Sequence, residues 1–190
     1  ELGGSTIYQN SELHKIGNKE SSVWLNEEIK ELKKIKNIDI KTRTSVAAFH
    51  GYNYLLAREN LTDHLPKSER INKIRQRLWK IRAKKVIIAT GAIERPLIFN
   101  NNDRPGILLS SAVKKYVDYY GVIAGKNSVI FTNNDTAYET TVSLFKKGVR
   151  INNIIDIRKK CSSNLINKVE NLGIKIYWEH TVVDTHGYKR

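Results

Sequence analysis

The chain of 190 residues contains no methionine, one cysteine and three prolines. A single cysteine, Cys161, excludes an internal disulfide, and unpaired thiols are typical of proteins from the reducing cytoplasm. We therefore expect a cytoplasmic protein. Because the sequence begins at Glu1 and has no methionine anywhere, we interpret it as an internal piece of a longer protein.

Long apolar stretches and clustered metal ligands are missing as well. No run of about 18 apolar residues exists, so no segment is predicted to cross a membrane. The N-terminus lacks the basic and then apolar segments of a secretory signal. The five histidines are scattered without the spacing of metal ligands, and no nucleophile elbow is present. The sequence therefore predicts no metal site and offers no candidate catalytic residue.

Charge of one sign dominates, with a net charge of +14 from 33 basic and 19 acidic residues. Such a balance is typical of nucleic-acid-binding proteins. The basic residues are spread along the chain, however, and the densest region is 67–85. Residues 77–84 alternate between apolar and basic, which indicates a half-buried strand with a solvated basic face. A basic nucleic-acid-binding module stays a distant alternative, and we expect no nucleic-acid partner.

The first half of the chain predicts one helix and then a meander of strands. Val23, Leu25, Ile29 and Leu32 form the apolar side of a helix that Ser21 or Ser22 can cap. Alternation and turn residues then predict strands over 38–50 and 53–61, a loop over 62–75, and a long strand over 77–89.

The long strand ends in the most informative stretch of the sequence. Val86-Ile87-Ile88 are three consecutive apolar β-formers, which predict a buried strand. The segment 89–92, Ala-Thr-Gly-Ala, follows directly, and such small residues allow another group to approach the backbone closely. In flavoproteins with two dinucleotide domains, that group is the cofactor.

The second half predicts a helix and then a compact βαβαβ unit. Ser110 is expected to cap a helix to about residue 120. Strands and helices then alternate over 128–132, 136–147, 151–157, 162–172 and 174–178, an order typical of a doubly wound parallel unit.

These elements together predict an α/β protein with the FAD/NAD(P)-binding, Rossmann-like fold of two dinucleotide domains. Residues 1–96 are expected to form the C-terminal part of the first domain, whose glycine fingerprint is missing upstream. Residues 97–126 form a connection and a helix. Residues 127–190 form a second Rossmann-like unit, degenerate and truncated.

The turn after the first strand of the second unit has no glycine. Phosphate cradles need glycines there, so that backbone N–H groups reach the pyrophosphate. Asn133 and Asn134 would crowd a pyrophosphate, so we expect this unit not to bind a nicotinamide nucleotide. Asp156 stands where a ribose-binding carboxylate belongs. We expect it to pair with a neighbouring base such as Arg158 instead.

Several segments resemble one family, the α subunits of heterotetrameric sarcosine oxidases. They are 89–99, 102–107, 111–112, 120–122 and 127–138. Asn102-Asp103-Arg104-Pro105-Gly106 is more specific than Ala-Thr-Gly, which many flavoproteins share. Amine- and imino-acid dehydrogenase subunits are organised similarly, so an FAD-dependent dehydrogenase subunit stays the main alternative.

The resemblance implies a complex that oxidises sarcosine to glycine, formaldehyde or methylene-tetrahydrofolate, and hydrogen peroxide. In that family the amine is oxidised at a flavin of the β subunit. The α subunit holds NAD, with FAD as the alternative here, and helps to enclose FMN; FAD and FMN belong to the complex. A tetrahydrofolate-handling domain follows downstream, and the implied partners are the β, γ and δ subunits and a small-molecule amine.

The resemblance also implies where the dinucleotide lies along the chain. The implied cofactor-binding residues are Gly3, Gly4 and Ser5 near the dinucleotide turn, Val46 on the strand that approaches adenine, and Thr90, Gly91 and Ala92 against the pyrophosphate and sugar. The chain is thus expected to hold a cofactor rather than to abstract a proton.

Overall fold

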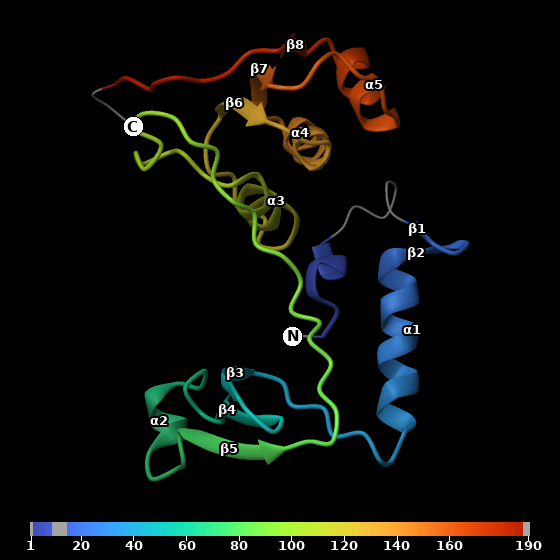
Figure 1. Ribbon diagram of the computed structural model, residues 1–190, viewed down its shortest axis with the longest axis vertical. Coiled ribbons are helices and arrows are strands. Elements are labelled where there is room, and N and C mark those ends of the chain that lie inside the picture. The colour runs from blue at the N-terminus through green and yellow to red at the C-terminus, as the bar shows by residue number, and fades with distance from the viewer. Residues whose placement is uncertain (1, 9–14, 188–190) are drawn as a thin grey trace. The chain divides into compact units, whose positions relative to one another are not determined.

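The computed structural model describes residues 2–8 and 15–187 (Figure 1). The chain divides into two compact units. The first comprises Glu1–Thr6 and Ile16–Gly91, and the second comprises Ile7–Lys15 and Ala92–Arg190.

The first unit is built around a three-stranded antiparallel meander. Its strands are β3 (Thr44–His50), β4 (Tyr54–Asn60) and β5 (Gln76–Arg82), hydrogen-bonded in that order. The other elements of the N-terminal region are η1 (Gly4–Tyr8), β1 (Lys15–Ile16), β2 (Lys19–Glu20), α1 (Ser21–Lys34) and the short α2 (Lys67–Arg70). Within the sheet, Trp79 Nε1 donates to Glu59 Oε2 at 2.7 Å. The meander predicted from the sequence is confirmed.

Two predicted strand boundaries in this unit are wrong. The strand expected to begin at residue 38 begins at Thr44, and the strand expected to reach residue 89 ends at Arg82. The buried strand predicted at Val86–Ile88 is also wrong, since Ile87 is 91% exposed and Ile88 70%. A strand needs a neighbour for its backbone groups. In the described part of the chain, β4 pairs with β5 only as far as Arg82, and no strand runs beside the segment that follows.

Helix α1 forms where the sequence predicts it, but it is not capped as expected. The residue before the helix is Glu20, whose side chain makes no capping bond. Ser21 is fully buried in the first turn, and its hydroxyl has no hydrogen-bond partner among the residues that the structure describes. The helix begins one residue earlier than a Ser21 cap requires, so Ser21 lies inside the first turn and the local cap signal fails here.

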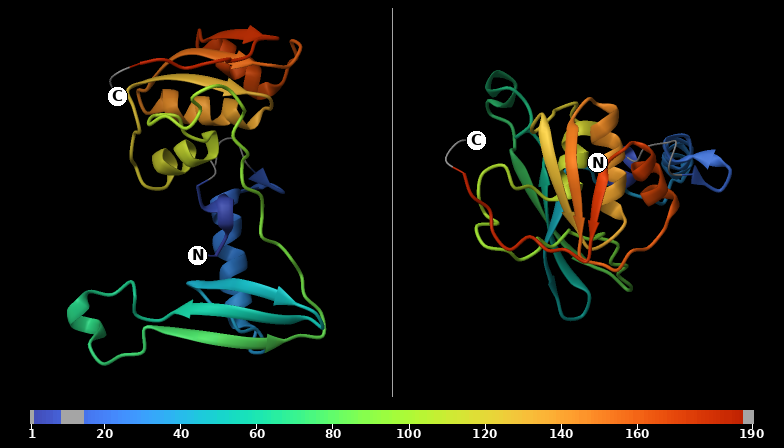
Figure 2. Two further views of the ribbon diagram at one scale, coloured as in Figure 1. Left: turned by 60° about the vertical axis from the view of Figure 1, so that its left-hand side comes forward. Right: turned by 90° about the horizontal axis from the view of Figure 1, so that it is seen from above.

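The second unit contains the predicted βαβαβ arrangement (Figure 2). Its elements are α3 (Ser110–Asp118), β6 (Asn127–Thr132), α4 (Thr136–Lys146), β7 (Arg150–Asp156), α5 (Asn164–Asn171) and β8 (Lys175–Trp178). The strands are parallel in the order β6-β7-β8. Ser163 caps α5 by accepting from the N–H of Ile166 at 3.3 Å.

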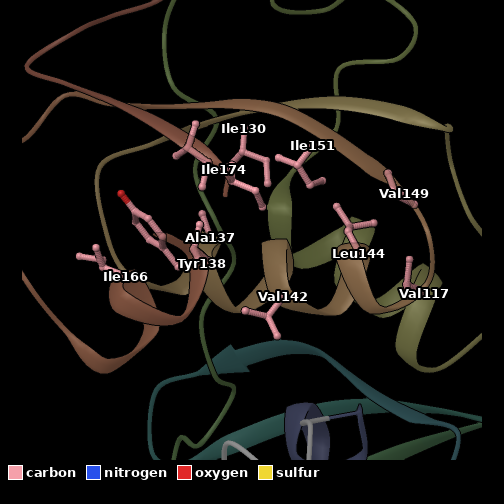
Figure 3. Packing of buried hydrophobic residues seen from close by; sticks show 12 residues of the cluster. Val117, Ile130, Ala137, Tyr138, Val142, Leu144, Val149, Ile151, Ile166 and Ile174 are labelled. Atoms are coloured by element: carbon pink, nitrogen blue, oxygen red, sulfur yellow. The ribbon is translucent and has the colours of Figure 1, made fainter. Parts of the chain in front are cut away.

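The core of this unit lies between the sheet and its helices (Figure 3). Ile130, Ile154 and Ile176 stand opposite one another across the three strands, so they share one face of the sheet. Tyr138 of α4 is fully buried and stacks on Trp178 at 6.5 Å between ring centroids. Burying these side chains fixes the carboxyl ends of the strands, where open α/β sheets bind their ligands.

Candidate functional site

The residues implied to contact a dinucleotide lie on three separate stretches. Gly3 precedes η1, and Gly4 and Ser5 begin it; Val46 lies on β3; and Thr90, Gly91 and Ala92 lie in the extended segment after β5. Val46 is 60% exposed. No hydrogen bond or ion pair among the described residues joins these stretches to one another, so their assembly into one site stays a prediction.

Gly91 has a backbone conformation that suits glycine. Its φ of +73° lies in the left-handed region that side chains disfavour. A Cβ atom built there meets no other atom within 4 Å. The backbone conformation therefore favours glycine, and no other described atom fills the space beside it.

Glu94 connects the segment after Ala-Thr-Gly to helix α3. Its carboxylate oxygens accept from the backbone N–H of Ser110 at 3.3 Å and of Ser111 at 2.7 Å. Free N–H groups at a helix start favour a carboxylate because of their partial positive charge. The prediction that Ser110 caps this helix is wrong, since its hydroxyl instead bonds the Thr140 hydroxyl at 2.8 Å. Local cap patterns could not reveal Glu94, which lies 16 residues before Ser110.

A cleft of about 980 Å³ runs along β6 in the second unit. The segment 94–97, residues 106–110 and the turn at Asn133 and Asn134 contribute to its lining. Phe99 and Phe131 meet edge to face inside it, with ring centroids 5.8 Å apart. A cleft in this place is where a second dinucleotide would be sought.

The turn after β6 is already occupied by its own side chains. Asn134 Oδ1 accepts from the backbone N–H of Thr136 at 3.0 Å, at the start of α4. The Thr132 hydroxyl donates to the Asn134 carbonyl at 2.9 Å. Asp135 adds a negative charge at the same helix start, where a nucleotide phosphate would bind. A phosphate would have to displace a bonded amide and approach a carboxylate.

A charged network closes the ends of β6 and β7. Asp156 is fully buried and accepts from Arg158 Nη2 at 2.8 Å and from the Tyr138 hydroxyl at 2.8 Å. Arg158 Nη1 also lies 2.8 Å from Asp135 Oδ1. The predicted pairing of Asp156 with Arg158 is confirmed, and the carboxylate expected to hold a ribose in an active unit is used inside the protein.

The pKa values of the network follow from its geometry. Burial by itself would raise the pKa of Asp156, but hydrogen bonds from the Arg158 side chain and backbone and from Tyr138 outweigh it and lower the pKa below its ordinary value. Burial, together with the bond to Asp156, raises the pKa of the Tyr138 hydroxyl. Asp156 is therefore ionised and Tyr138 neutral at pH 7.

The motif at residues 102–106 and the residue before it bind the last described residues of the chain. Arg104 donates to the carbonyls of Thr185 at 2.9 Å and Gly187 at 3.0 Å. Asn101 Nδ2 donates to Asp184 Oδ1 at 2.8 Å, a bond that lowers the pKa of that carboxyl. The sequence did not reveal this contact, because the two segments lie more than 80 residues apart.

An antiparallel meander followed along the chain by a parallel βαβαβ unit defines an α/β protein of the dinucleotide-binding kind, and a comparison with solved structures supports that class. The structure resembles the L-proline dehydrogenase from P. horikoshii, with a TM-score of 0.58 and 25% sequence identity, over 84% of this chain and 29% of that one. The predicted fold class is confirmed. No metal-binding cluster of acidic, histidine or cysteine side chains exists in the described part, and none of its helices is long and apolar enough to cross a membrane.

Among curated proteins, the similar ones are sarcosine oxidase α subunits. The α subunit from Corynebacterium sp. (strain P-1) is 36% identical over 97% of this chain, and that from Corynebacterium sp. (strain U-96) is 33% identical over the same share. The Rhizobium meliloti (strain 1021) subunit is 35% identical over 82%. This chain spans 19%, 19% and 15% of those proteins. No family model matches the sequence. The chain thus matches a fragment of the sarcosine oxidase α subunit, and the resemblance seen in the sequence is confirmed.

Proposed function

We propose that this chain is the dinucleotide-binding portion of the α subunit of a sarcosine oxidase complex. The complex would oxidise sarcosine to glycine and produce hydrogen peroxide. Flavin in a partner subunit would take the electrons from the amine. The observation that carries the proposal is the 36% identity to such an α subunit over 97% of the chain.

The cofactor of this chain is proposed to be NAD, with FAD as the alternative. Thr90, Gly91 and Ala92 would line its pyrophosphate and sugar, and the lack of a side chain at Gly91 would let the cofactor approach the backbone closely. The second unit would hold no nucleotide, because Asn134, Asp135 and the Arg158–Asp156 pair occupy the place of one. One dinucleotide is therefore expected for each α subunit.

The relatives are named as subunits, which supports a multi-subunit assembly. We propose that the partners are subunits of the β, γ and δ types and that the complex also contains FAD and FMN. The proposal further includes a tetrahydrofolate-handling region elsewhere in the subunit and a cytoplasmic location.

A second candidate is a subunit of an FAD-dependent amino- or imino-acid dehydrogenase. The structural similarity to an L-proline dehydrogenase favours it. The nucleic-acid alternative gains no such support. Some of the basic side chains are engaged within the chain, since Arg77 lies over the Trp79 ring at 5.4 Å and Arg158 is paired with Asp156.

Identifying the released dinucleotide separates these candidates. The full-length parent protein, co-expressed with its partner subunits, is denatured, and the released compounds are identified by mass. NAD together with flavins is the expected result. FAD as the only dinucleotide would favour the dehydrogenase, and the absence of any dinucleotide would contradict the cofactor-holding role.

Gly91→Asn tests the cofactor segment directly. Asparagine tolerates positive φ better than other side chains, so this change adds bulk above the segment with little backbone strain. We expect dinucleotide occupancy of the complex to fall several-fold while the subunit still folds. The matched control is Gly148→Asn, at a φ of +78° after α4 and equally open. Full occupancy in Gly91→Asn would show that the dinucleotide does not approach this residue.

A further inference from the structure

We infer that Glu94 is a positioning residue for the dinucleotide segment. By capping α3, its carboxylate fixes the course of the chain that leaves Ala-Thr-Gly. This inference rests on the proposed function, in which Thr90, Gly91 and Ala92 contact the dinucleotide.

The first argument is how sparsely this segment is anchored. Asn53 Nδ2 donates to the carbonyl of Lys84 at 3.1 Å, and Asn102 Nδ2 donates to the carbonyl of Leu97 at 3.1 Å. Between these two points, the hydrogen bonds that the described residues make are the two that Glu94 accepts from α3. Extended backbone without a pairing strand has many conformations to lose. Among the described residues, Glu94 is therefore the side chain that anchors this segment between Lys84 and Leu97.

The second argument is that the cap comes from a distant residue although a local one is present. Serine is a preferred capping residue, and Ser110 stands at the start of α3. Its hydroxyl instead bonds Thr140 of α4, which is buried. A local cap would satisfy N–H groups in the first turn of α3 without holding the preceding segment. The arrangement found here ties the residues just after Ala92 to the packed pair α3 and α4.

The third argument is proximity along the chain. Glu94 follows Ala92 by two residues, and Ala92 belongs to the same compact unit as α3. Two residues of extended chain span only a short distance, so the positions of their ends are closely coupled. A displacement of Glu94 is therefore transmitted to Ala92 and to the peptide that joins it to Gly91.

The test compares two lost helix caps in the full-length complex. Glu94→Ala removes the cap of α3, and Ser163→Ala removes the cap of α5, whose residues lie far along the chain from Ala-Thr-Gly. We expect Glu94→Ala to raise the dissociation constant of the dinucleotide about fivefold, the factor in an equilibrium constant that corresponds to one lost cap, and the dinucleotide content retained after extensive dialysis measures this loss. Ser163→Ala should speed amide exchange in α5 and leave the dinucleotide content unchanged.

Glu94→Gln keeps one oxygen acceptor for the N–H of Ser111 and should retain an intermediate dinucleotide content. If the complex with Glu94→Ala does not assemble, the dinucleotide content of Glu94→Gln is compared with the wild type instead. Full dinucleotide content in both Glu94 variants, or an equal loss in Ser163→Ala, would overturn the positioning role while the proposed function stands. Wild-type complex without dinucleotide would overturn the proposed function itself, and this inference with it.

Discussion

Replacing Arg158 by methionine is expected to raise local opening at the carboxyl ends of β6 and β7 at least about 100-fold over the wild type. The change leaves the fully buried Asp156 carboxylate without its cation. Removing one partner of a buried pair costs about 3–5 kcal/mol, and each 1.4 kcal/mol is roughly a factor of ten. Native-state hydrogen exchange of the β7 amides in the parent subunit measures this opening.

Two further variants test the cause of that effect. Lys159→Met removes the same charge one residue along, from an exposed position, and should leave the exchange of β7 unchanged. Combining Arg158→Met with Asp156→Asn removes the buried charge while an amide oxygen still accepts from Tyr138, so part of the protection should return. If the double variant exchanges faster than Arg158→Met alone, the unpaired carboxylate is not the cause.

The pH dependence should have opposite signs in the two proteins. In the wild type the pKa of Asp156 is lowered, so its stabilisation is complete above about pH 4 and is lost as the pH falls through the lowered pKa. Without Arg158, burial raises that pKa, and the penalty is relieved as the pH falls. Exchange of β7, corrected for its intrinsic rate, should therefore differ most near pH 7 and converge in acid. A difference that does not change with pH would exclude Asp156 as the titrating group.

Lys114→Met is expected to separate α3 from α4 with a cost of about 3 kcal/mol, again roughly a 100-fold rise in local opening. The Lys114 side chain is only 8% exposed. Its Nζ lies 3.2 Å from Asp118 Oδ2 and 3.1 Å from Glu139 Oε1, and it donates to the Tyr8 carbonyl at 2.9 Å. Without it, two largely buried carboxylates lose a shared cation. Hydrogen exchange of the α3 amides in the parent subunit measures the effect.

The control for this variant is Lys168→Met, an exposed lysine near the end of α5, which should change α3 exchange little. Adding Asp118→Asn to Lys114→Met removes one of the two negative charges and keeps an acceptor for the Ser143 hydroxyl, which bonds Asp118 at 3.1 Å. Partial recovery is expected. No loss of protection in Lys114→Met would mean that apolar packing alone holds the two helices together.

Periodicity predicted the second unit well because its signals are local. Alternating apolar runs and the glycine after α4 determine where β6, α4 and β7 begin and end, to within a residue or two. Periodicity failed at Val86–Ile88, where the residues favour a strand but the described chain offers no neighbouring strand to pair with it. A run of β-formers predicts the tendency to pair, and only tertiary structure supplies the partner.

The sequence by itself determined the α/β class, the order of the elements and the pairing of Asp156 with Arg158, because these follow from patterns within a few residues. Tertiary structure alone decided that Glu94 rather than Ser110 caps α3, that Lys114 joins two helices, and that Arg104 clamps residues 185 and 187. Some of these contacts join residues 16 or more positions apart. In the others, several local partners were equally plausible from the sequence. Which polar group meets a buried donor or charge depends on how the packed elements approach one another, and no local pattern contains that information.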